Sequence, residues 1–180
     1  MVELSVIVPI RNEAPGLVEL HRELTDTLER WGRSYEIVAI DDGSTDDSFA
    51  VLTKLHAMDP RLRVIRFRRN FGQTAAFAAG FEHARGRIIV TTDGDLQNDP
   101  HDIPAMIAKL ESGYDIVCGW RKNRKDSFVS RTVHLSSVTF RKALRRRTAT
   151  VSRRVDRFIA IVVFGLLHTV DAAGGRSSLR

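Results

Sequence analysis

The sequence predicts a Rossmann-like α/β domain over residues 1–120, built on a mostly parallel sheet with flanking helices. Two observations predict it. Short runs of β-branched and aliphatic residues alternate with segments of helical periodicity, and polar clusters follow several of those runs directly. Strands that alternate with helices pair in parallel through right-handed crossovers. The chain has 180 residues, 43% of them hydrophobic, which is enough to bury a core and argues against a disordered chain.

Five strands are expected, and each is short and closed by a turn-forming or polar cluster. They are residues 2–8, 35–40, 62–67, 87–92 and 114–118. In the fourth, Ile88, Ile89 and Val90 are all apolar, which is typical of a strand covered on both faces.

Four helices are expected between these strands. They are residues 14–31, 45–58, 74–84 and 103–110. In the first, Leu20, Leu24 and Leu28 recur at a spacing that places them on one buried stripe. Thr45 can cap the second helix. The third is rich in alanine, the best helix former.

Four polar clusters follow predicted strands at the point where each strand ends. They are residues 9–13, 41–42, 93–97 and 119–121. Ligands of such sheets bind beyond the carboxyl ends of the strands. These clusters are therefore the candidate binding site.

Asp93 and Asp95 flank Gly94 directly after an apolar strand, and Gln97 follows two residues later. Gly94 lets the chain turn so that both carboxylates can face one cavity. Two close carboxylates repel, and Mg²⁺ or Mn²⁺ relieves that repulsion, with a nucleotide diphosphate completing the coordination. The alternative is a solvated turn, because a bare pair of aspartates at this spacing is common. The apolar strand and the neighbouring Gln97 favour the metal site.

Asp41 and Asp42 have two alternative roles. One is a tight turn in which Ser44 or Thr45 caps the next helix. The other is a carboxylate that accepts hydrogen bonds from a base or ribose, since capping alone needs neither aspartate. Residues 68–73 also have two interpretations: an anion-attracting helix N-terminus or a solvated basic loop.

Charge divides the chain into two parts. Residues 1–120 carry 13 Lys and Arg against 19 Asp and Glu, a net charge of −6, whereas residues 121–180 carry 15 against 3, a net charge of +12. An acidic domain followed by a basic segment favours an anionic partner. The single cysteine, Cys118, excludes an intramolecular disulfide framework, and the first residues lack the pattern of a secretory signal peptide. A reducing, cytoplasmic setting is therefore expected.

Five motifs in one order resemble a known family. They are VIVPIRNE, EIVAIDDGSTDDS, RNFGQTAAFAAGFEHARG, TTDGDLQNDPHDIP and GYDIVCGWRKNRKD. Together they resemble family 2 glycosyltransferases of the GT-A fold, in the subgroup of polyprenyl-phosphate sugar transferases similar to dolichyl-phosphate mannose synthase. The resemblance covers residues 1–127 as a GT-A domain, and the ordered set is far more specific than any one motif.

The resemblance implies site residues of three kinds. Contacts with the nucleotide-sugar donor are implied for Pro9, Arg11, Glu13, Asp41, Asp42, Asp93, Gly94 and Arg121. Metal ligation is implied for Asp93, Asp95 and Gln97, with Mg²⁺ or Mn²⁺ as the cofactor, and Asp93 and Asp95 are the expected catalytic residues. Arg121 resembles the arginine that meets the donor phosphates. Arg11 departs from the aromatic residue often found at its position, which would stack on the base.

The resemblance implies inverting, metal-dependent transfer of a hexose from a UDP- or GDP-sugar to a polyprenyl phosphate. The implied location is peripheral, at the cytoplasmic face of the membrane, with an anionic membrane surface as a partner and room for a membrane-protein partner. No nucleic-acid partner is expected. A lipid phosphate is already an anion at neutral pH, so no general base is assigned.

After about Phe128 the motifs stop, and residues 128–180 form a basic segment for which helical or irregular structure is expected. One hypothesis is a shifted reading frame in the gene, which would leave a truncated or altered transferase. A second is an amphipathic helix on anionic lipid, with Phe140, Leu144 and Val151 near one face. A third is a helix that packs on the core. The apolar run at 158–167 is shorter than the roughly 20 residues that cross a bilayer, so no transmembrane helix is expected.

Three other functions remain open at this point. A sugar nucleotidyltransferase could use a similar acidic rim, but no Gly-rich loop with a basic residue lies near the first strand. A nucleic-acid-binding protein could use the basic segment, which has no recognisable zinc, RNP or GxxG module. A truncated chain could bind the donor and lack transfer activity.

Overall fold

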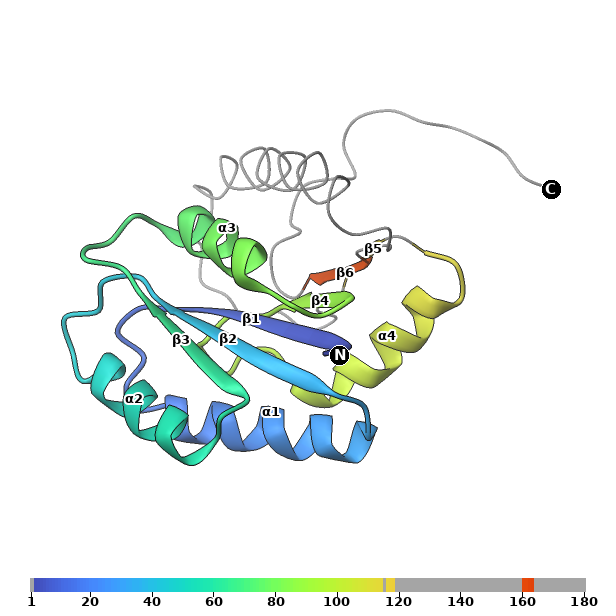
Figure 1. Cartoon of the computed structure of the whole chain (residues 1–180), viewed down its shortest axis with the longest axis horizontal. Coiled ribbons are helices and arrows are strands. Elements are labelled where there is room, and N and C mark those ends of the chain that lie inside the picture. Colours follow the sequence, from blue (N-terminus) through green and yellow to red (C-terminus); the bar gives the residue numbers. More distant parts are fainter. Residues whose placement is uncertain (1, 115, 119–159, 164–180) are drawn as a thin grey trace, which may run out of the picture.

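A computed structural model describes residues 2–114, 116–118 and 160–163. Its centre is a six-stranded sheet in the order β3-β2-β1-β4-β6-β5, in which every described pair of neighbours is parallel (Figure 1). The strands are β1 (Leu4–Ile10), β2 (Tyr35–Asp41), β3 (Leu62–Arg66), β4 (Ile88–Thr91), β5 (Ile116–Cys118) and β6 (Ala160–Val163).

Helices cover both faces of this sheet. They are α1 (Leu17–Trp31), α2 (Ser48–Met58), α3 (Gln73–His83) and α4 (Ile103–Glu111), with a short 3-10 helix, η1 (Pro100–Asp102), before α4. Figure 1 shows α1 and α2 on one face and α3 on the other. The α/β fold that the sequence predicts is confirmed.

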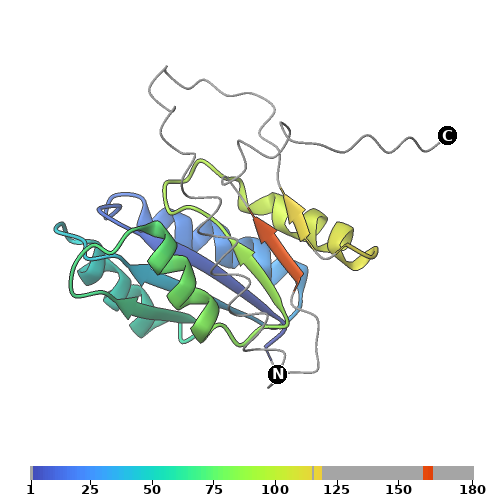
Figure 2. The same ribbon diagram turned by 90° about the horizontal axis from the view of Figure 1, so that it is seen from above.

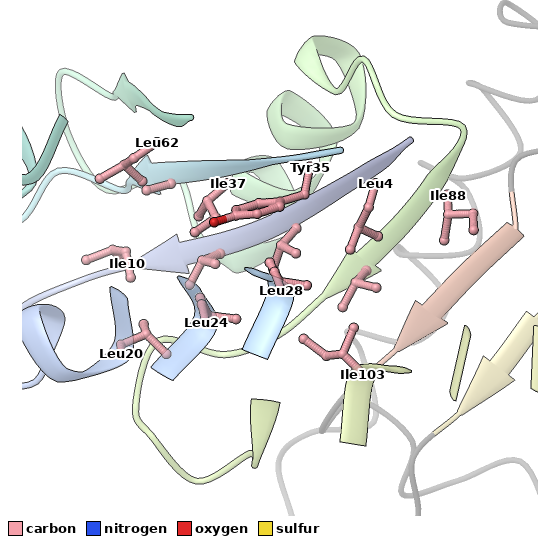
Figure 3. Packing of buried hydrophobic residues seen from close by; sticks show 14 of the residues in the cluster. Leu4, Ile10, Leu20, Leu24, Leu28, Tyr35, Ile37, Leu62, Ile88 and Ile103 are labelled. Carbon is pink, nitrogen blue, oxygen red and sulfur yellow. The ribbon is translucent and has the colours of Figure 1, made fainter. Parts of the chain in front are cut away.

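Two apolar clusters hold the layers together because alternate strand residues point to opposite faces. On the α1 side, Leu24 and Leu28 pack toward the central strands with Leu4 and Ile37, all buried (Figure 3). This confirms the predicted leucine stripe. On the α3 side, Phe77 and other buried residues of the helix pack on the opposite face of the same strands.

The nine predicted elements are all present, with bounds that shift by no more than three residues. Two expectations need correction. Thr45 does not cap the second helix, because α2 begins at Ser48 after Asp47. Residues 160–163 form a strand between β4 and β5, as Figure 2 shows in red, although helical or irregular structure was expected there. The other hypotheses on the basic segment fall on residues outside the described ranges, as does Arg121.

In the described part of the chain, no helix combines the length and the apolar character needed to cross a bilayer.

Candidate functional site

The loop after β1 is tied to the loop after β2. Asn12 adopts a φ of 56°, a left-handed conformation that asparagine tolerates better than most residues. Its backbone N–H donates to Ser44 Oγ at 3.1 Å, and its side-chain Oδ1 accepts the Thr45 N–H at 2.8 Å. Thr45 thus belongs to the contact between these two loops, whereas α2 begins three residues later, at Ser48. Asn12 lies in the predicted polar cluster 9–13, but its bonds to the loop after β2 were not predicted.

Glu13 is fixed by its backbone beside the start of α2. Its N–H donates to Ser48 Oγ at 2.9 Å, and the next amide, from Ala14, donates to Asp46 Oδ2 at 3.2 Å. The carboxyl group of Glu13 lies close enough to other carboxylates to interact with their charge. Burial, and then the charges of Asp95 and Asp46, raise the pKa of Glu13 above its ordinary value.

The segment 93–95 runs directly against the end of β1. A Cβ added at Gly94 would lie 2.5 Å from Ile10 Cδ1, 3.2 Å from the Pro9 carbonyl oxygen and 3.8 Å from Glu13 Cγ. A side chain here would displace the end of the Ile10 side chain and crowd the Pro9 carbonyl oxygen, so glycine suits this approach. Gly94 therefore brings the two flanking aspartates to the edge where Glu13 lies. The predicted gathering of the β1 and β4 clusters is seen in the structure.

The two aspartates of this segment are held differently. Asp93 is half-buried, and its Oδ1 accepts the side-chain amide of Gln73 at 2.8 Å. Asp95 is exposed, and its Oδ1 accepts the Gln97 N–H at 3.1 Å, which closes a short turn. Sequence reasoning missed Gln73 as a partner of Asp93, because Gln73 begins α3 and Asp93 follows β4, 20 residues later.

Asp41 and Asp42 are both buried at the end of β2. Asp41 Oδ1 accepts the Ser44 N–H at 3.1 Å, as a tight turn requires, and its Oδ2 lies 3.6 Å from Arg66 Nε. Asp42 uses both carboxylate oxygens on the loop after β3: Oδ1 accepts the Phe71 N–H at 2.7 Å and Oδ2 the Gly72 N–H at 2.9 Å. Asp42 therefore anchors that loop, a role that neither sequence interpretation included.

The remaining predicted site residues lie around this edge. Pro9 is in β1 beside Gly94, Arg11 and Gln97 are exposed, and Arg121 lies outside the described residues. Within the described ranges, no three His, Cys, Asp or Glu side chains form a group that could hold a metal by themselves. Mg²⁺ commonly takes one or two protein carboxylates and completes its shell with substrate phosphates and water. The exposed Asp95 and the crowding of carboxylates around Glu13 fit a cation held in that way.

Glu13→Gln is expected to leave the metal-free protein as stable as the parent at pH 7.5, or more stable by less than about 1 kcal/mol. The pKa of Glu13 is raised on folding, so this side chain stabilises the fold most while protonated. That contribution is lost as the pH rises through its folded pKa. Urea unfolding at pH 4, 5.5 and 7.5 in chelator measures this effect. The free energy of unfolding of the variant should increase relative to that of the parent as the pH rises.

Glu19→Gln is the matched control, because a hydrogen bond from Arg22 lowers the pKa of Glu19 despite a smaller opposing effect of burial. The control should lose stability relative to the parent as the pH rises, or show no measurable change. A Glu13→Gln variant that loses stability in the same direction as Glu19→Gln would contradict the raised pKa of Glu13, and with it the burial and carboxylate charge that cause it.

The family comparison matches most of the chain. The sequence model described as Glycosyl transferase family 2 matches residues 5–169. Among curated proteins, the dodecaprenyl-phosphate galacturonate synthase of Rhizobium johnstonii is 44% identical over 133 residues, which are 73% of this chain and 39% of that protein.

Solved structures show a similar fold. S. aureus TarS 1-349 in complex with UDP-GlcNAc is 21% identical with a TM-score of 0.58, over 70% of this chain and 37% of that one. The mannosyltransferase PcManGT from Pyrobaculum calidifontis, in complex with GDP-Man and Mn²⁺, is 26% identical with a TM-score of 0.54, over 66% of this chain and 36% of that one. The chain thus spans less than two fifths of the length of each of these three proteins. The predicted GT-A-like fold and the predicted resemblance are confirmed, and the chain belongs to glycosyl transferase family 2.

Proposed function

We propose that this chain carries the donor site of a glycosyltransferase that moves a sugar from a UDP- or GDP-sugar to a polyprenyl phosphate. The observation that carries the proposal is the placement of residues 93–95 against the end of β1, where a Cβ at Gly94 would crowd Pro9 and Ile10. The proposal is supported by 44% identity to a dodecaprenyl-phosphate galacturonate synthase and by a fold shared with structures that bind UDP-GlcNAc and GDP-Man.

Asp95 and Gln97 would hold a Mg²⁺ or Mn²⁺ ion, with Asp93 beside the ion or the ribose. When bound, the ion supplies positive charge that stabilises the departing diphosphate. Gln73 occupies Oδ1 of Asp93 and so fixes the direction of this carboxylate relative to the donor. Arg121, by the family resemblance, would pair with the donor phosphates. Asp41 and the Asp42-anchored loop would border the nucleoside.

The proposed reaction is a single displacement with inversion at the anomeric carbon. An oxygen of the polyprenyl phosphate forms a bond to that carbon while the bond to the diphosphate oxygen breaks. The attacking phosphate is already ionised, so no side chain is needed to remove a proton. The main obstacle to the reaction is electrostatic, because the donor diphosphate, the acceptor phosphate and the acidic edge are all negatively charged. Arginines and a divalent cation would neutralise part of this charge. A lipid-linked acceptor and a nucleotide-sugar donor would meet at the cytoplasmic face of a membrane, which is the location that we propose.

Calorimetric titration of the full chain with UDP-galacturonate, UDP-GlcNAc and GDP-mannose, with and without Mn²⁺, tests the proposal. We expect one of these donors to bind in a Mn²⁺-dependent manner. Transfer of the labelled sugar of that donor to a polyprenyl phosphate would then test the second half of the reaction. Absence of binding by a protein with a cooperative thermal transition would overturn the donor site. Binding without transfer would restrict this chain to donor binding.

A further inference from the structure

We propose that the loop of residues 67–72, between β3 and α3, is a contact surface for the anionic headgroups of a phospholipid bilayer. We call it the arginine loop. The inference extends the proposed function, because it names the surface that would approach the membrane holding a lipid-linked acceptor. It stands on the position, charge, rigidity and exposure of this loop.

The arginine loop lies at the same edge of the sheet as the donor site. Because β1, β2, β3 and β4 are parallel, the loops that follow them meet at one edge (Figure 1). An acceptor phosphate embedded in a bilayer can reach the donor only if part of this edge comes to the level of the headgroups. The opposite edge, where α2 ends at Met58, would then face away from the membrane.

The loop is joined to the donor site on two sides. Asp42 accepts the N–H groups of Phe71 and Gly72, and the next residue, Gln73, donates to Asp93. A Cβ at Gly43 would lie 2.3 Å from the carbonyl carbon of Arg69, so the two loops are in close backbone contact. A surface held in one conformation loses little conformational entropy when it binds.

Charge sets this loop apart from the acidic domain around it. Residues 60–81 contain five arginines and neither Asp nor Glu, whereas residues 1–120 carry a net charge of −6. Arg61 and Arg63 form ion pairs with Asp59 and Glu36. In the described part of the chain, by contrast, no carboxylate lies within ion-pair distance of Arg68 or Arg69, and both side chains are exposed. Exposed arginines of this kind attract the phosphates of an anionic leaflet.

The same loop exposes an aromatic ring. Phe71 is 49% exposed, its ring meets that of Phe67 edge-on at 5.6 Å, and the Arg69 guanidinium lies 4.9 Å from its centroid. One exposed apolar residue is ordinary in a soluble domain. An exposed aromatic ring under the Arg69 guanidinium, with the exposed Arg68 in the same loop and no carboxylate partner for either arginine among the described residues, is a combination suited to the membrane–water interface. Rings and guanidinium groups sit together there at headgroup level.

A fluorescent label at position 71 tests the proposal without interference from the basic segment. In a Cys118→Ser background, Phe71→Cys carries an environment-sensitive NBD label, and the full chain is mixed with vesicles of phosphatidylcholine and phosphatidylglycerol at 3:1. We expect a blue shift and a gain in emission with these vesicles and little change with phosphatidylcholine alone. Met58→Cys, 72% exposed at the other edge of the sheet, is the matched position and should show no shift.

A pair of charge-removing substitutions tests whether the arginines of this loop, and not those elsewhere in the protein, cause the vesicle-induced shift. Arg68→Gln with Arg69→Gln should abolish the shift at position 71, whereas Arg30→Gln, an exposed arginine in the last turn of α1, should not. Thermal transitions of all variants should match that of the labelled parent, which excludes unfolding as the cause.

Three results would overturn the proposal: no shift at position 71, equal shifts at positions 71 and 58, or a shift at position 71 with a single-stranded oligonucleotide as large as with vesicles. The last would assign the loop to nucleic acid. If vesicles induce the shift in a protein that binds none of the tested nucleotide sugars, the proposed membrane surface is supported and the proposed donor site is rejected.

Discussion

Gly43→Ala is expected to lower the free energy of unfolding by about 2–4 kcal/mol. Gly43 has a φ of +64°, and an added Cβ would lie 2.3 Å from the Arg69 carbonyl carbon and 2.6 Å from the Asn70 nitrogen. The substitution therefore combines a left-handed conformation that costs an L-residue about 1–2 kcal/mol with an overlap that backbone must move to relieve. Urea unfolding monitored by circular dichroism measures the loss.

Gly32→Ala separates the two contributions. Gly32 has a φ of +76°, but nothing lies within 4 Å of the Cβ that it would gain. This variant should lose only about 1–2 kcal/mol, because it has the conformational cost without the overlap. Equal losses in the two variants would mean that the loops after β2 and β3 are not in the close contact that the structure shows.

The same pair of variants links the loop contact to the site. Movement of Arg69 and Asn70 away from Gly43 would disturb the amides that Asp42 accepts, and with them the position of Gln73 beside Asp93. Donor affinity should therefore fall in Gly43→Ala and stay close to the parent value in Gly32→Ala, when both are measured at a temperature where they remain folded.

The architecture was predictable because it depends on local patterns. Periodicity identified the helices and strands, and the parallel order of the strands follows from their alternation. β6 was not predicted for a physical reason. The four residues 160–163 are too few to distinguish a strand from a buried helix, and their partners in β4 lie about 70 residues earlier in the chain.

The gathering of candidate site residues at one edge was also predictable, since the carboxyl ends of parallel strands meet there. The hydrogen bonds within it were not. An aspartate after a strand has the same sequence pattern whether it faces a ligand or, like Asp42, accepts two amides from a loop 29 and 30 residues away. The missed cap is a second example: α2 begins at Ser48, three residues after Thr45, and the Thr45 N–H donates to Asn12 in the loop after β1.

The close approach of carboxylates at this edge destabilises the fold, and this destabilisation points to a functional site. Burial, and then the nearby charges of Asp95 and Asp46, raise the pKa of Glu13, which the stability of the fold alone does not favour. Groups that conflict with the stability of the fold are expected mainly at functional sites. A cation bound beside Asp95 would remove this conflict, which connects the electrostatics of the edge to the proposed donor site.

Asp95→Asn is expected to weaken Mn²⁺-dependent donor binding by about 100-fold or more, since even residues that only support metal ligands contribute 10- to 100-fold. Asparagine keeps an Oδ1 that can accept the Gln97 N–H, so the turn should survive while the charge is lost. The same loss of charge relieves Glu13, so the metal-free variant should be as stable as the parent or slightly more stable.

The matched control is Asp102→Asn, an exposed aspartate before α4 whose side chain makes no capping hydrogen bond. It removes the same charge from the same connection and should leave donor binding unchanged. Calorimetric titration in Mn²⁺, paired with urea unfolding in chelator, distinguishes the outcomes. Equal donor affinity in the two variants would remove Asp95 from the donor site. Lost binding together with lost stability would mean that Asp95 supports the fold instead of a ligand. Only weakened binding in a fully stable Asp95→Asn protein fits a carboxylate that the fold holds at this edge for a cation and a diphosphate.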